Sequence, residues 1–487
     1  MAADFHFEQR IAFTPTGAQE ILRSVPAVPG VFALRGERAT DEPYLTRAAD
    51  LRRRLTRLLA PPDSQSKRLN LRERVNTIEY TVTGSEFESL LVLYDAAAAS
   101  FGYTEARRRL RLHTPFLLRL TIEHEHPRVY TTNRLTKKGL AQTYGPFPSR
   151  SAAERYLDGV LDLFQLRRCH EDLEVHADHP GCAYGEMKRC MAPCNLGCSA
   201  EEYRREAAQV EAFLRTHGES MLQAIGRERE QASAEMEFER AAALHERFSK
   251  VKAIAMLADD LVRPIAQVRG VIVQAAIPHE GDGERQEAAV FLLEGGCVYG
   301  PERLSTLGVR AVKEQTSVGS SLFAQPLMLQ AVPLDDAAST PVESPEVRAE
   351  AVLSHLGARV RPGGDLAQVS DHLSLLRRWY YRPEKQRAGE IFLPNPDGSW
   401  PVRRILRGAA RMALGEPKAM AETDRAGAAA AKTKILHEGR PDVERVVPVL
   451  GPSTRRGRKT SAASEKQEAG KLAESTFRAD EGTGRSG

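Results

Sequence analysis

The first hundred residues mix strand-like and helix-like patterns of apolar positions. The run Val31-Phe32-Ala33-Leu34 follows the turn pair Pro29-Gly30 and is typical of a short buried strand. Leucines recur at helical spacing over residues 47–59, with arginines between them, which predicts an amphipathic basic helix that ends at Pro61. Alternation over residues 78–82 predicts a half-buried strand, and a helix is expected over 86–98. Together these elements predict a small α/β unit.

The rest of the chain carries helix and strand patterns in separate blocks. No proline occurs between Pro193 and Pro264, which favours helix throughout that stretch, and Gly295-Gly296 is a turn signal between two apolar runs. The patterns predict a strand over 116–122, a helix over 151–164, helices over 200–260, a β-hairpin over 271–298, a helix over 345–381 and a last ordered piece that ends near residue 414.

The segment from Gly415 onward lacks the side chains that build a core. It contains no Trp, Tyr or Cys and a single Phe, and it is rich in Ala, Lys, Glu, Gly and Ser. Such a composition cannot bury enough apolar surface to offset the entropy lost on folding. We therefore expect residues 415–487 to be disordered.

Length and charge narrow the class of protein. A chain of 487 residues predicts about three folded units. The 69 Lys and Arg residues against 65 Asp and Glu leave a net charge of +4, which is too small to establish nucleic-acid binding by itself. No stretch approaches the roughly 18 apolar residues of a membrane span, and the first residues do not resemble a secretory signal. These features predict a cytoplasmic protein with no membrane partner.

Five of the six cysteines fall within thirty residues, and only Cys297 stands apart. In a reducing compartment such a cluster indicates metal binding rather than disulfide cross-linking. Cys169, Cys182, Cys190 and Cys194 have spacings that suit four thiolates around Zn²⁺ or an iron–sulfur cluster, with Cys198 as a spare thiol. Three nearby histidines, at positions 170, 176 and 179, keep zinc open as an alternative. Buried cysteines that act as small apolar residues would not explain five in one segment.

These blocks predict an α+β multidomain chain. We expect a small α/β domain over 12–100, a connecting region over 101–168, a cysteine-rich metal segment over 169–200, a helical region over 201–262, a β-hairpin and helical C-terminal domain over 263–414 and a disordered tail over 415–487.

The small α/β domain carries a set of short motifs in order. Pro29-Gly30-Val31-Phe32 is followed by Tyr44-Leu45-Thr46-Arg47 and then by the basic helix with Arg54. This arrangement resembles the GIY-YIG nuclease domain of the UvrC family, bacterial excision-repair nuclease subunits, which have Pro-Gly-Val-Tyr and Tyr-Val-Gly-Lys at these places. The resemblance implies a GIY-YIG-like fold and a role in cutting or holding DNA.

The resemblance continues over roughly residues 12–300. Lys188-Arg189-Cys190-Met191-Ala192-Pro193-Cys194 matches the Lys-Arg-Cys-x-Ala-Pro-Cys signature of the UvrC family, and residues 237–244 are similar to its UVR motif. The resemblance implies a [4Fe–4S] cluster on the four cysteines and a contact with a UvrB-like protein through a helical UVR hairpin. Nothing in the sequence resembles the family's RNase H-type domain or its helix-hairpin-helix tail.

Two positions that the family needs for catalysis carry apolar residues here. A GIY-YIG nuclease uses a phenol near the attacking water, a carboxylate for one divalent metal ion and an arginine beside the scissile phosphate. Tyr44 and Arg54 are retained, and Arg47 replaces a lysine. Phe32, however, replaces the first motif tyrosine, and Leu93 replaces the metal-binding glutamate. We expect an inactive or weakened nuclease, with Mg²⁺ or Mn²⁺ bound only if activity survives.

A neighbouring carboxylate could still complete the site. Glu88 and Asp95 flank Leu93, but the five residues between Glu88 and Leu93 turn a helix by about 500°, so Glu88 should face elsewhere, and Asp95 lies on another face. An active endonuclease that makes a single incision therefore remains the alternative.

Basic residues near the motif predict contacts with DNA phosphates. Candidates are Arg52, Arg53 and Arg57 on the basic helix and Arg107, Arg108 and Arg109 further along the chain. Such contacts give affinity without sequence selectivity and depend strongly on salt. The alternative is that these arginines form an ordinary solvated surface.

The UVR-like helix carries an apolar stripe from Phe238 to Ile254 at helical spacing. Such a stripe is more often the seam of an intramolecular helical hairpin than a docking surface. On the family resemblance, the residues expected to contact a UvrB-like partner are Phe238, Glu239, Ala241, Ala242 and Leu244.

Three functional hypotheses follow from these patterns. The first is a UvrC-like DNA-binding component of nucleotide excision repair that docks on UvrB and has an inactive or weakened nuclease site. The second is an active single-incision DNA endonuclease. The third is a metal-stapled nucleic-acid-binding regulator that has no part in excision repair.

Overall fold

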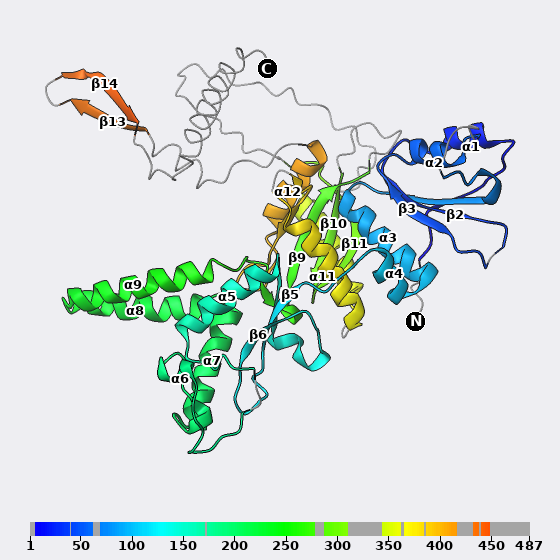
Figure 1. Cartoon of the computed structure of the whole chain (residues 1–487). Helices are drawn as coiled ribbons and strands as arrows, with labels where there is room; N and C mark the ends of the chain where they lie inside the picture. Colours follow the sequence, from blue (N-terminus) through cyan, green and yellow to red (C-terminus); the bar gives the residue numbers. More distant parts are fainter. Residues whose placement is uncertain are drawn as a thin grey trace, which may run out of the picture. The chain divides into compact units, whose positions relative to one another are not determined.

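The computed structural model describes residues 5–38, 40–61, 69–170, 173–277, 287–309, 343–361, 365–383 and 386–415, and the backbone of residues 432–437 and 440–448. The chain divides into two compact units, residues 1–416 and 417–487. Within the described residues the first unit holds three antiparallel four-stranded sheets with helices around them (Figure 1), which agrees with the predicted α+β class.

The N-terminal sheet has the strand order β1-β4-β2-β3. Its strands are β1 (Gln9–Ala12), β2 (Gly30–Arg35), β3 (Tyr44–Ala48) and β4 (Thr77–Val82). Helices α1 (Ala18–Ser24) and α2 (Leu51–Leu59) cover one face, and Leu51, Leu55 and Leu59 are fully buried there against Phe32. The predicted strands at 31–34 and 78–82 are therefore present as neighbours in this sheet.

The basic helix is shorter than its leucine pattern predicts. Residues 44–48 form β3, which pairs with β2, and the helix begins only at Leu51. Asp50 ends the strand because its carboxylate accepts a hydrogen bond from the Arg53 backbone N–H at 2.8 Å and so caps the helix. The prediction of helix from residue 47 was therefore wrong, because a capping residue outweighed the helical periodicity.

The C-terminal sheet has the order β11-β10-β9-β12 and lies between two pairs of helices. Its strands are β9 (Arg269–Ala275), β10 (Glu287–Glu294), β11 (Cys297–Ser305) and β12 (Glu390–Phe392). Helices α10 (Pro345–Ala358) and α12 (Val402–Leu414) cover one face, and α11 (Leu366–Tyr380) packs on the other. Gly295 and Gly296 have positive φ angles in the turn between β10 and β11, as the hairpin prediction requires.

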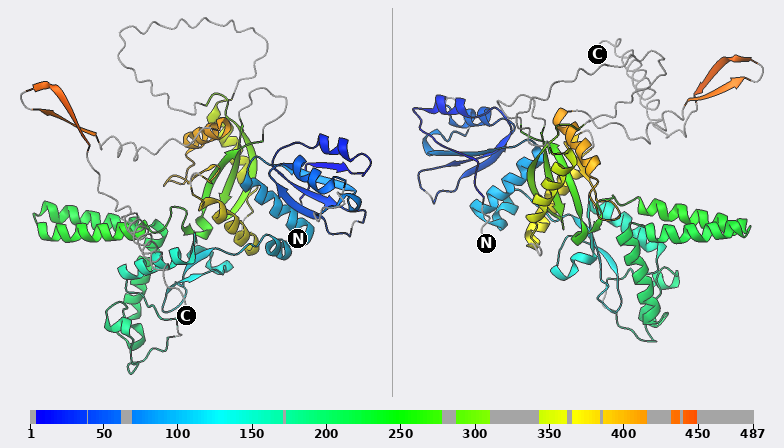
Figure 2. Two further views of the ribbon diagram at one scale, coloured as in Figure 1. Left: turned by 45° about the horizontal axis from the view of Figure 1, so that its top comes forward. Right: turned by 180° about the vertical axis from the view of Figure 1, so that it is seen from behind.

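Helix α3 (Glu86–Phe101) packs on two sheets at once (Figures 1 and 2). Its alanines meet Leu45 of the N-terminal sheet. On another side, the Phe87 ring lies 5.8 Å from that of Phe291 on β10 and 5.1 Å from that of Trp379 on α11. The helix expected to complete the first domain therefore also belongs to the core of the C-terminal sheet.

The helix predicted over 345–381 is divided into α10 and α11. Ser344 caps the start of α10, and Asp365 caps the start of α11 by accepting a hydrogen bond from the Ala367 backbone N–H. The apolar pattern continues through both helices, so this pattern alone did not reveal the division, which the Asp365 cap marks in the structure.

The middle sheet and the long helices share a third core. The sheet has the order β6-β5-β7-β8, and the expected strand over 116–122 is β5. The elements are α4 (Tyr103–Arg109), β5 (Phe116–Leu120), β6 (Val129–Thr132), β7 (Thr143–Phe147), α5 (Arg150–Leu163), α6 (Ala183–Glu186), α7 (Ala200–Thr216), α8 (Glu219–Ala234), α9 (Phe238–Ala255) and β8 (Arg263–Pro264). Short 3₁₀ turns lie at Arg72–Arg74, Lys137–Gln142, Pro193–Asn195 and Ile265–Gln267.

The second unit contains one described element pair. Strands β13 (Lys432–His437) and β14 (Arg440–Pro448) run antiparallel. The rest of the tail expected over 415–487 lies outside the described residues apart from Gly415. Among the helices of the described residues, none combines the length and apolar character that crossing a membrane requires.

Candidate functional site

Tyr44 and Arg54 meet at the edge of the N-terminal sheet. A guanidinium nitrogen (Nη2) of Arg54 donates a hydrogen bond to the Tyr44 hydroxyl at 3.2 Å. β3 supplies the tyrosine and α2 supplies the arginine. The Phe32 ring lies 6.3 Å from the Tyr44 ring and is fully buried in the core beneath α2. A phenol and a cation are thus brought together, and the neighbouring Phe32 ring offers no polar atom.

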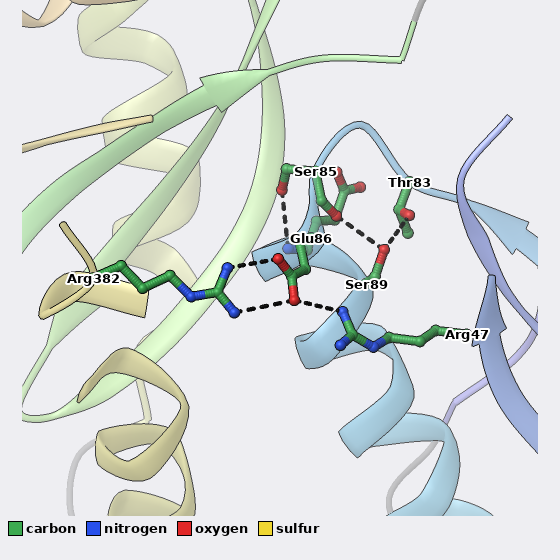
Figure 3. Close-up of polar contacts among 7 residues, drawn as sticks. Arg47, Thr83, Ser85, Glu86, Ser89 and Arg382 are labelled. Carbon is green, nitrogen blue, oxygen red and sulfur yellow. Dashed lines mark hydrogen bonds and ion pairs between the residues drawn. The ribbon is translucent and has the colours of Figure 1, made fainter. Parts of the chain in front are cut away.

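Arg47 points to the other side of β3, because side chains alternate along a strand. There its guanidinium lies 2.9 Å from the carboxylate of Glu86, the first residue of α3. Arg382, which follows α11, donates to the same carboxylate at 2.5 and 3.1 Å (Figure 3). The hydrogen bond from Arg382 and that from Arg47 lower the pKa of Glu86 to about 2, so it is ionised at neutral pH.

Leu93 lies seven residues after Glu86, which is two helical turns, so the two side chains share one face of α3. Leu93 is half-buried and offers no oxygen to a divalent ion. Glu88 is buried, and its carboxylate accepts a hydrogen bond from the Gly84 backbone N–H at 2.8 Å, where it supports the start of the helix. Burial raises the pKa of Glu88 to about 7.

Asp95 is a carboxylate with no hydrogen bond or ion pair within the described part of the chain. Burial raises its pKa from the ordinary 3.8 to about 7. Below about pH 4 the group is protonated in both the folded and the unfolded chain. Between about pH 4 and 7 the unfolded chain loses the proton more readily, so stability falls as the pH rises and then stays constant above about pH 7.

We therefore expect Asp95→Asn to stabilise the protein at pH 8 by about 1–3 kcal/mol and to have little effect near pH 4. Thermal or urea unfolding at the two pH values measures this difference. Asp158→Asn, an exposed position on α5, is the matched control and should leave the pH dependence unchanged. An equal effect of Asp95→Asn at both pH values would contradict an ionisable Asp95 whose pKa is raised.

Four of the cysteines influence one another. Cys190 and Cys194 are buried, whereas Cys169 and Cys182 are half-buried. Burial raises the pKa of Cys190 to about 11, and the charges of the other three thiols add to the effect. Burial also raises the pKa of Cys194, with contributions from Cys182 and Cys169. The pKa of Cys198 is raised most by burial, next by the charge of the nearby Glu202 and least by Cys194. The four predicted ligands thus lie near enough to influence one another's pKa, whereas Cys198 interacts mainly with Glu202 and Cys194.

The surroundings of the thiols suit sulfur ligands. The Ala192 backbone N–H points at the Cys190 sulfur at 3.3 Å, and the Arg167 guanidinium at the Cys169 sulfur at 3.8 Å. Among the described residues no group of three or more His, Cys, Asp or Glu side chains is gathered tightly enough to hold a metal ion. His179 uses its Nδ1 atom to accept a hydrogen bond from Gly181, so this nitrogen is occupied. Whether a cluster or zinc binds stays a prediction.

The predicted DNA-contacting arginines have different surroundings. Arg53 and Arg57 are exposed on α2, and Arg52 donates to the Val25 carbonyl. Arg107 lies 2.7 Å from the buried Asp371 carboxylate, which also accepts a hydrogen bond from the Tyr94 hydroxyl. Arg108 and Arg109 both pair with Glu105, and Arg109 also reaches Glu42. Arg107, Arg108 and Arg109 are therefore all ion-paired with carboxylates of the same chain.

Comparison with known proteins adds independent information. The family model of the UvrC/Cho excinuclease middle domain matches residues 116–213. UvrABC system protein C of Dehalococcoides mccartyi is 26% identical over 296 residues, which are 61% of this chain and 47% of the relative. The protein of that name from Desulforudis audaxviator is 28% identical over 296 residues (60% and 45%), and that from Haemophilus ducreyi 29% over 238 residues (49% and 38%). No solved structure matches.

The chain is similar to UvrC-family proteins and shares their middle domain. It spans about half the length of the curated relatives it matches. The matched middle domain contains β5, β6, β7, α5, α6 and the five clustered cysteines and ends within α7. The cysteine segment therefore lies inside the part that is shared with UvrC proteins.

The apolar stripe of α9 is mostly the seam of a helical hairpin. Leu244, Val251 and Ile254 are buried, and α9 packs along α8 as an antiparallel partner. Phe238 is 69% exposed and Ala242 is also exposed, at the end of the hairpin where α8 joins α9. The stripe thus has a buried seam and an exposed end at Phe238. Met236, just before α9, is 74% exposed beside that end.

Two features of this chain were not predicted from the sequence patterns. The carboxylate of Glu86 pairs with Arg47, whereas the substitutes expected from the sequence were Glu88 and Asp95. The seven-residue spacing from Glu86 to Leu93 was the available signal. Helix α12 carries four arginines and no acidic residue, a signal that its sequence already contains.

Proposed function

We propose that the chain is a UvrC-like, DNA-binding component of nucleotide excision repair that docks on a UvrB-like protein and has an inactive or weakened GIY-YIG nuclease site. The observation that carries this proposal is the state of that site. Tyr44 and Arg54 are in contact, but Phe32 is buried in the core and Leu93 stands where the family has its metal-binding glutamate.

The remaining groups can bind a phosphate better than they can hydrolyse one. Hydrolysis of a phosphodiester needs a proton acceptor for the water and a metal ion to stabilise the leaving oxygen. Arg54 can neutralise a phosphate, and the Tyr44 hydroxyl can donate a hydrogen bond to it. The Arg47 guanidinium, in contrast, is already paired with Glu86. We therefore expect this site to bind DNA but not to cut it efficiently.

The cysteine segment supports a cofactor of the kind that the family resemblance implies. Cys169, Cys182, Cys190 and Cys194 would hold a [4Fe–4S] cluster, with zinc as the alternative. The backbone N–H of Ala192 and the Arg167 guanidinium would then donate to thiolate sulfurs. Such a group supplies four metal–sulfur bonds that tie together a segment with little apolar core of its own.

The exposed end of the α8–α9 hairpin is the surface proposed to dock on UvrB. Phe238 is a large exposed aromatic residue, and such residues often dominate the binding energy of an interface. Ala242 follows one helical turn later on the same face. Glu239 lies beside them and would contribute to the choice of partner.

We expect Phe238→Ala combined with Ala242→Asp to reduce coprecipitation with UvrB by at least about 10-fold, because it removes an aromatic anchor and places a charge in the interface. The matched control is Val347→Ala with Ala351→Asp, which makes the same kind of change at two exposed positions of α10 and should bind normally. Failure of the wild-type chain to bind UvrB would contradict the docking proposal.

A second candidate function is an active single-incision endonuclease. The observation that favours it is Glu86, which places a carboxylate beside Arg47 on the same face of α3 as Leu93. Two guanidinium groups already occupy this carboxylate, and a metal ion would have to displace them. This competition makes the inactive site the better-supported proposal.

A further inference from the structure

Helix α12 presents a basic face to solvent. Arg403, Arg404 and Arg407 are exposed and lie within an arc of about 100° on the helix. The helix contains no Asp or Glu. Within the described residues, none of these three arginines makes an ion pair or a side-chain hydrogen bond. They differ in this respect from Arg108 and Arg109, whose charges are matched by carboxylates.

The packing of α12 fixes which way this face points. Ile405, Leu406 and Ala409 are buried against β9 and β10. Gly408 allows a close approach, because a Cβ atom there would lie 2.4 Å from the Phe392 ring. Arg411 makes two hydrogen bonds to Glu390 on β12, at 3.0 and 2.7 Å, and both side chains are largely buried. These contacts leave the three arginines on the outside and prevent rotation about the helix axis.

The placement of these charges is unfavourable for the isolated helix. Arg403 and Arg404 lie in the first turn, where the positive end of the helix dipole repels cations. No side chain caps this end, and no acidic residue lies in the first turn. Neighbouring like charges at positions 403 and 407 also repel each other. An anionic partner would remove both penalties.

We propose that α12 binds the phosphate backbone of duplex DNA. Guanidinium groups donate paired hydrogen bonds to phosphate oxygens, and three of them within about one turn can reach successive phosphates. A membrane surface fits poorly, because a membrane-bound helix must insert its apolar face, and the apolar face of α12 is buried in the protein. The inference rests on the proposed function only in taking DNA as the ligand, and it adds a surface outside the N-terminal sheet.

The test measures the affinity of the full chain for an undamaged duplex oligonucleotide of mixed sequence as a function of salt. The variant Arg403→Gln/Arg404→Gln/Arg407→Gln should bind more weakly, and the slope of log affinity against log salt should fall in magnitude by about 2–3, close to one for each lost phosphate contact. The variant with lysine at all three positions keeps the charges and should retain most of the slope.

The matched control removes three arginines that are ion-paired in the structure, with Arg150→Gln/Arg240→Gln/Arg359→Gln. It loses the same net charge, and its salt slope should equal that of the wild type. Equal slopes for the α12 variant and the wild type would overturn the inference while leaving the proposed function intact. An equal loss in the control would also overturn it, because net charge alone would then explain the effect. If the wild type does not bind DNA, the inference and the proposed function both fail.

Discussion

Leu93→Glu is expected to raise the Mg²⁺- or Mn²⁺-dependent nicking of lesion-containing duplex DNA by at least about 10²-fold over the wild-type chain. The wild type itself should leave the duplex almost intact. The new carboxylate would lie on the face of α3 that already carries Glu86, two turns away, and would supply the hard oxygen ligand that leucine lacks. Adding Phe32→Tyr to restore the phenol should increase the rate further.

The matched control for this gain of activity is Val92→Glu. It adds the same charge to the adjacent, half-buried position, but on another face of α3, and it should not restore nicking. Thermal unfolding of each variant checks that the helix still packs. Robust nicking by the wild type, lost in both Arg54→Ala and Glu86→Gln, would contradict the inactive site and establish the second candidate function, with Glu86 as the missing carboxylate.

Cys190→Ser is expected to abolish metal binding and to lower the melting temperature by roughly 10 °C, because metal–thiolate bonds stabilise this segment directly. Anaerobically purified wild-type protein should contain about four iron atoms per chain and show visible absorption. Elemental analysis, the visible spectrum and thermal unfolding measure these three properties. Cys190 is the most informative position because it is buried and is influenced by all three other predicted ligands.

Cys198→Ser is the matched control for the cysteine experiment. It makes the same chemical change within the same segment, but at a thiol whose pKa is raised mainly by burial and by Glu202. Metal content and stability should remain as in the wild type. One zinc ion per chain and no colour would replace the cluster by zinc on the same ligands. Protein without any metal, equally stable in Cys190→Ser, would contradict a metal site.

Local patterns predicted the elements of the fold well where one pattern dominated. The strand at 31–34 and the helix at 86–98 appear as β2 and α3, the strand because a continuous apolar run follows a turn pair there. The segment around Arg47 was predicted as helix because its leucines and arginines have helical spacing. The ladder with β2 and the Asp50 cap, which depend on pairing partners, decided otherwise.

The candidate site was predictable only as a set of residues, not as an arrangement. The motif spacing identified Tyr44, Arg54 and Arg47, but not that Tyr44 and Arg47 point to opposite sides of β3. The partner of Arg47 could be found neither from the motif nor from composition, because Glu86 is also held by Arg382, which is almost 300 residues away. Pairings over such distances depend on how the sheets pack, and no local pattern encodes them.

The position of α3 between two sheets affects how the chain can fold while it is being synthesised. Phe87 is translated about 290 residues before Trp379, the ring on which it packs, which corresponds to roughly 15 to 60 s of elongation. During that time one apolar side of α3 has left the ribosome without its partner strands. Helix α3 therefore reaches its final packing only after the C-terminal sheet has been made, and until then the nascent chain is a natural client for chaperones that shield exposed apolar helices.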